Sequence, residues 1–123
     1  MSATDTLIST LETFGLPVFR QGSLAEDAPY PDAFFTFWNT SSEGACYYDD
    51  VAHAVTWSFY VYHYTSDIET LESKLSEAAE ALRAIGFVIS GMGFDVGSDV
   101  QTHFGRAVTA RYTERKEPNN GKE

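Results

Sequence analysis

The stretch that decides the fold is HAVTWSFYVYHY, residues 53–64, because it alternates as a β-strand does and yet neither of its faces is polar. One face carries Val55, Trp57, Phe59, Val61 and His63, and the other carries Thr56, Ser58, Tyr60, Tyr62 and Tyr64. A strand in a small domain usually buries one face and exposes the other to water. The tyrosine face of this strand therefore needs a cover of its own.

Two segments have the apolar spacing of amphipathic helices. The first is residues 4–15, and Gly15 is expected to end it. The second is residues 66–86, where Ser66 is the expected N-cap and Glu69, three residues later, completes a capping box. Along the chain, the sequence predicts one helix before and one helix after the first two long strands.

The remaining apolar segments alternate as strands do. Strands are expected at residues 16–22, 33–40, 87–91 and 103–115 in addition to the opening stretch. Residues 41–52 are interpreted as a long hairpin loop and residues 92–102 as a glycine-rich turn. This order predicts an α+β fold, an antiparallel sheet of four to five strands with two helices packed on one face.

The length of 123 residues fits one domain, expected over residues 1–115 and followed by a polar tail at 116–123. No apolar run approaches the roughly 20 residues that a membrane helix needs. No basic segment followed by an apolar stretch opens the chain, so neither a signal peptide nor a membrane partner is expected.

The net charge of −10 is concentrated in the middle of the chain. Between Arg20 and Arg106 there are thirteen acidic residues and two basic ones. Such a surface repels phosphate, so specific binding of nucleic acid is not expected. The same surface would let DNA pass without holding it.

Signals for catalysis are weak. Cys46 with His53 has no third residue that would orient a nucleophile and its base. His53 and His63 are about 33 Å apart if the strand is continuous, too far to share a metal ion. We expect no enzyme activity, no metal and no cofactor.

The acidic loops are candidates for docking instead. Loops over residues 23–32 and 41–50 are expected to face a lumen or neighbouring proteins, because docking residues usually lie on loops of a rigid scaffold. The candidate carboxylates are Asp49, Asp50, Asp95 and Asp99. The last two lie among glycines but lack the ligand spacing of an EF-hand loop.

The tyrosine face is the candidate interface. Two short helices can cover one side of four strands, so Tyr60, Tyr62 and Tyr64, together with Trp38, are expected on the side without helices. An exposed patch of this size is unusual for a monomer, and a second copy of the chain is the expected cover. The alternative is a cross-strand ladder of tyrosines with their hydroxyls in water.

Four stretches resemble the tail-terminator, or tail-completion, proteins of long-tailed bacteriophages and prophages. They are YPDAFFTFWN, DDVAHAVTWSFYVYHYT, SDIETLESKLSEAAEALRAIGF and THFGRAVTARYTE, within residues 4–114. The resemblance implies a hexameric ring that caps the tail tube and docks to the head connector, with genomic DNA passing through its lumen. It also implies assembly in the host cytoplasm and a final place in the virion, and it assigns no catalytic residue.

Other functions stay open at this point. One is another neck or tail adaptor, such as a head-closure protein. A second is a small dimeric α+β domain that binds an apolar ligand on its aromatic side chains. A third is an enzyme that uses Cys46, or His53 with Asp49 and Asp50.

Overall fold

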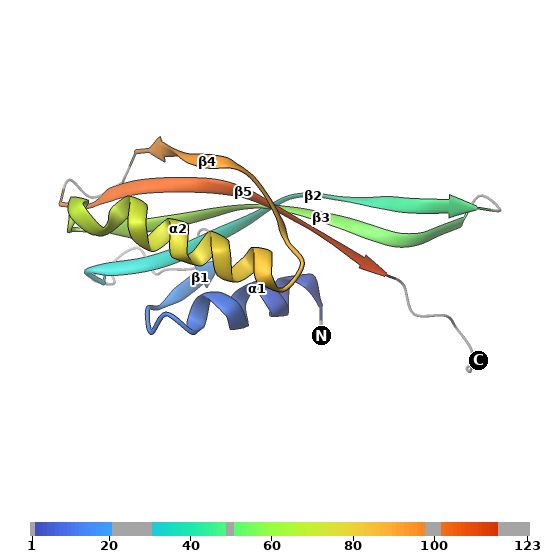
Figure 1. The fold of residues 1–123 in the computed structure, drawn as a ribbon, viewed down its shortest axis with the longest axis horizontal. Coiled ribbons are helices and arrows are strands. Elements are labelled where there is room, and N and C mark those ends of the chain that lie inside the picture. Colours follow the sequence, from blue (N-terminus) through green and yellow to red (C-terminus); the bar gives the residue numbers. More distant parts are fainter. Residues whose placement is uncertain (1, 21–30, 49–50, 98–101, 116–123) are drawn as a thin grey trace.

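The chain forms two helices and one five-stranded sheet, which is the α+β fold that the sequence predicts (Figure 1). The computed structural model describes residues 2–20, 31–48, 51–97 and 102–115. The elements in chain order are α1 (Ala3–Glu12), β1 (Val18–Arg20), β2 (Ala33–Tyr48), β3 (Val51–Thr65), α2 (Ile68–Ala84), β4 (Val88–Val96) and β5 (Phe104–Arg115).

The strands lie in the order β1-β2-β3-β5-β4. All neighbours are antiparallel except β1 and β2, which are parallel with Val18 opposite Phe35. The sheet is therefore mostly antiparallel, as predicted, with one parallel pair at this edge. The chain between Arg20 and Ala33 is long enough for the wider connection that parallel neighbours need.

Both helices lie on the same side of the sheet (Figure 1). Their apolar stripes bury Leu7, Leu11, Leu75 and Leu82. The sheet contributes four fully buried residues to the same cluster, which are Phe35, Phe37, Phe59 and Val61. Each such side chain contributes roughly 1.5–3 kcal/mol, so this layer carries most of the stability of the fold.

The cap of α2 differs from the predicted one by one residue. Asp67 is the N-cap, and its Oδ1 accepts a hydrogen bond from the backbone N–H of Glu69 at 3.0 Å. Ser66 instead donates its backbone N–H to the carbonyl of Asp32 at 2.9 Å. This tertiary bond ties Ser66 to the start of β2 and occupies the backbone N–H that the predicted capping box would bond to Glu69.

The segment read as a hairpin loop at 41–52 is mostly strand. β2 runs on to Tyr48 and β3 begins at Val51, with a register shift between Asn39 and Ser41. We call residues 41–48 of β2 and 51–56 of β3 the arm, and it projects beyond both helices (Figure 1). Ser, Glu and Gly have a low propensity for strands, so the extended conformation of the arm results from its pairing with the strong strand β3.

β4 is longer than predicted and contains an irregularity. Its register against β5 shifts between Ser90 and Phe94, and Gly91 and Gly93 have φ of 69° and 99°. A β-carbon on Gly93 would lie 2.9 Å from the carbonyl oxygen of Ala107. The glycines therefore form a bulge inside the strand rather than the predicted turn.

Candidate functional site

The face of the sheet away from the helices carries a continuous run of aromatic rings, which we call the aromatic band. Its members are Phe19, Phe34, Trp38, Tyr60, Tyr62, Tyr64 and Phe94. They belong to β1, β2, β3 and β4, and strand alternation puts them opposite the buried core residues. The structure thus brings together the four predicted interface residues, Trp38 and the three tyrosines.

Ring contacts connect the band from one edge of the sheet to the other. Phe34 stacks on Tyr64 with their centroids 5.4 Å apart, and Tyr64 stacks on Tyr62 at 6.1 Å. Tyr60 meets Tyr62 edge to face at 6.2 Å and Phe94 at 6.1 Å. Contacts of this geometry contribute about 0.5–1.5 kcal/mol each beyond the area they bury, so the band is a preformed surface.

Three successive cross-strand rows of this face contain no charged residue. They are Phe34–Tyr64–Gly105–Val96, Thr36–Tyr62–Ala107–Phe94 and Trp38–Tyr60–Thr109–Ser90. The next row brings the first charge, Arg111, opposite Ser58. A neutral surface of this extent is conspicuous on a chain with a net charge of −10.

The band is only partly shielded by its own packing. Trp38 is 50% exposed, Phe94 45% and Tyr60 38%, whereas Tyr62 and Tyr64 are half-buried. Burial raises the pKa of the Tyr62 hydroxyl, and the neighbouring Tyr60 raises it further. The tyrosine hydroxyl therefore stays a neutral donor at physiological pH.

His63 lies on the opposite, helix-side face and is 1% exposed. Its Nδ1–H donates to the carbonyl of Phe34 at 3.1 Å, and its ring packs against that of Phe35 with the two centroids 4.8 Å apart. Burial lowers the pKa of His63 to about 4; the bond to Phe34 opposes this shift and Lys74 adds to it. A neutral, bonded imidazole in the core has a structural role.

Asp95 is not a loop carboxylate as the sequence suggested, because it lies in β4. Its Oδ1 accepts from Arg106 at 2.7 Å, and Arg106 also donates to the carbonyls of Met92 and Gly93 at 3.3 Å. The pair holds the bulge in place. Asp49, Asp50 and Asp99 lie outside the described residues, as does most of the acidic loop at 23–32.

The remaining predicted candidates lie on the arm. The backbones of Cys46 and His53 belong to β2 and β3, and their side chains are outside what the structure describes. Among the described residues, no cluster of three metal-ligating side chains occurs. One groove lies between α2 and the β4 bulge. Another, of about 330 Å³, lies beside Ile68 and Phe104 and reaches Gly105 and Val96 at the end of the band face.

Phe19 and Phe94 are members of the band that sequence reasoning missed. Phe94 lies in the segment interpreted from the sequence as a glycine-rich turn, whereas β4 continues through it to Val96. Phe19 reaches the band because β1 adds parallel to β2. The extent of β4 and the place of β1 in the sheet carry no signal in residue types.

No helix among the described residues is long and apolar enough to cross a membrane. No known family model and no curated protein matches the chain.

Proposed function

We propose that this protein is a structural component of a phage virion, a tail terminator that forms a ring of six copies. The ring would cap the tail tube and join it to the head connector. The observation that carries the proposal is the aromatic band, a neutral face with no helix over it. A face of this kind supports assembly, because large exposed apolar patches mark protein contacts.

The side chains of the band suit a protein interface. Tyrosine and tryptophan bury a large area at a low cost in side-chain entropy, and they are frequent anchors of binding energy. Trp38 and Tyr60 lie side by side in one row and are both exposed. Their partner in the proposal is a second copy of the chain.

The charge of the chain supports the passage of DNA. An excess of acidic residues lowers the affinity for phosphate, so genomic DNA would slide through the lumen without specific contacts. The proposed partners are therefore the chain itself, the tail tube protein and the neck connector. The proposed place is the tail or neck of the virion, after assembly in the host cytoplasm.

The experiment is mass photometry of the purified protein, alone and with tail tubes of the same phage. We expect closed assemblies of six copies on the tubes, whether or not the free chain is monomeric. Negative-stain images should show a ring at the tube end. A single copy bound to each finished tube would refute the proposal.

The aromatic band also supports a second candidate, a two-fold dimer that holds an apolar ligand between two such faces. Mass photometry distinguishes the two, because this candidate gives dimers with or without tail tubes. An apolar fluorescent dye should then bind to the dimer and lose binding in Trp38→Ala.

A further inference from the structure

The exposed part of the aromatic band is too small to make a ring contact alone. Trp38, Tyr60 and Phe94 are 50%, 38% and 45% exposed. An aromatic side chain can bury about 150–250 Å², so the three together offer roughly 300 Å². A stable interface buries about 800 Å² on each partner. Since each partner buries a comparable area, the contact must extend beyond the band and involve a larger element of the neighbouring copy.

Ring symmetry excludes the band of the next copy as that element. A face meets its own counterpart only when two copies are related by a half-turn, as in a two-fold dimer. Neighbours in a closed ring of six are related by a smaller rotation, so the contact joins two different surfaces. The band of one copy must therefore meet another surface of the next.

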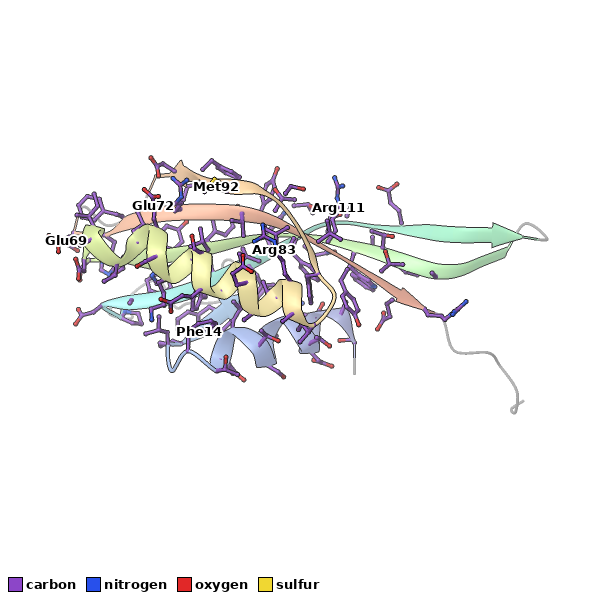
Figure 2. All side chains as sticks on the ribbon, in the orientation of Figure 1. Phe14, Glu69, Glu72, Arg83, Met92 and Arg111 are labelled. Atoms are coloured by element: carbon purple, nitrogen blue, oxygen red, sulfur yellow. The ribbon has the colours of Figure 1, made fainter. Side chains whose placement is uncertain are left out.

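The outward side of α2 is a poor match for the band. Its exposed carboxylates are Glu69, Glu72, Glu77 and Glu80 (Figure 2 labels the first two). The three rows of the band contain no cation that could pair with them. Glu77 and Glu80 pair with Lys74 and Arg83 on the helix itself, whereas Glu69 and Glu72 make no ion pair with any described residue. Burying Glu69 and Glu72 against aromatic rings would cost their hydration without compensation.

The arm offers a better match. It projects past both helices, so its helix-side surface lacks the helix layer that covers the rest of that face (Figure 1). The register puts Ser42, Gly44 and Val55 on this surface, in line with Trp57. Ser42 and Gly44 are exposed, and small side chains let aromatic rings approach the backbone closely.

The charges beside these two surfaces are complementary. Arg111 is exposed next to the band and makes no ion pair with any described residue. Glu114 lies opposite Val55 on the arm side, where it accepts the indole N–H of Trp57 at 3.1 Å. A carboxylate oxygen has capacity for a further donor.

We propose that the helix-side surface of the arm in one copy covers the aromatic band of the next copy, with Glu114 of the first beside Arg111 of the second. This inference rests on the ring proposed above and names the two surfaces that meet in it. The contact is head-to-tail, so it can repeat around a closed ring.

Disulfide cross-linking tests the proposal. Ser42→Cys on the arm and Ser90→Cys beside the band are introduced together in a Cys46→Ser chain, which is assembled on tail tubes and oxidised. A non-reducing gel should show a ladder that ends at the full ring. The matched control carries Glu43→Cys, on the other side of the arm, in place of Ser42→Cys. The gel of this control should show no ladder.

Each other outcome is decisive. Assembled rings that show no ladder, or a ladder from the Glu43→Cys control, would overturn the arm contact but leave the ring. Dimers from Ser90→Cys alone would show two-fold packing, and cross-links to the tube protein would show that the tube covers the band; either overturns this inference. Absence of rings for the unaltered chain would refute the proposed function itself.

A charge exchange gives an independent readout. Arg111→Glu should weaken assembly, and adding Glu114→Arg should restore it. Failure of this rescue in chains that stay folded would contradict the pairing of the two residues.

Discussion

The ring of Tyr64 lies against the α-carbon of Gly105, so closely that a β-carbon there would be 2.6 Å from Cε1 of the tyrosine. The two residues are cross-strand partners in β3 and β5. Val96 closes the same site, at 2.8 Å from that β-carbon position. The glycine is therefore required for Tyr64 to lie flat in the aromatic band.

We expect Gly105→Ala to destabilise the fold by roughly 1–3 kcal/mol, the usual cost of overpacking. The melting temperature measures this loss. Gly97→Ala is the matched control, because no atom lies within 4 Å of its β-carbon position. Equal melting temperatures for the two variants would contradict the close packing of Tyr64.

Tyr62→Ala and Phe59→Ala should separate assembly from folding. Tyr62 lies on the aromatic band, so its truncation should cost roughly 1–3 kcal/mol of association and less of fold stability. Phe59 is fully buried under the helices, and its truncation should cost roughly 3–5 kcal/mol of fold stability. Thermal melts and mass photometry of both variants test this. If Tyr62→Ala unfolds the chain and Phe59→Ala only weakens assembly, the roles of the two faces are reversed.

The buried His63 should make the fold sensitive to acid. Its pKa is lowered from 6.5 to about 4 in the folded chain, so between these values the unfolded chain binds a proton that the folded chain does not. The stabilisation is complete above pH 6.5 and is lost as the pH falls toward 4, by roughly 3 kcal/mol in total. Urea unfolding across this range should show a steeper loss for the unaltered chain than for His63→Gln. Equal slopes would contradict the assignment.

Cys46→Ser should leave assembly and infectivity unchanged, because serine is close in size to cysteine and no coherent catalytic arrangement is expected around Cys46. Particle yield and the melting temperature are the measurements. A well-folded Cys46→Ser protein without function would favour the enzyme alternative.

Periodicity explains which parts of this fold the sequence predicts. The alternation in residues 53–64 places Tyr60, Tyr62 and Tyr64 on one face, and helical spacing locates α1 and α2. The predicted N-cap of α2 differs by one residue, because the carbonyl of Asp32 accepts the backbone N–H of Ser66 that a capping box would bond to Glu69. Interactions between distant segments leave no local signal.

The same limit applies to the arm and to the candidate site. Ser41 to Gly44 form strand because β3 pairs with them, although their own propensity is low. Phe94 joins the aromatic band because β4 continues through its glycine bulge and pairs with β5 beyond it. The membership of the band therefore follows from strand order and register, which residue types alone do not specify.

The bulge in β4 also bears on how large an assembly of this protein can grow. An outer strand with a regular backbone can add copies edge to edge without limit, as amyloid fibrils do. Gly91 and Gly93 interrupt the hydrogen-bonding repeat of this edge. Arg106 holds the bulge in this conformation, because it donates hydrogen bonds to the carbonyls of Met92 and Gly93. Loss of the clamp in Arg106→Ala would straighten that edge and expose the protein to fibrillation.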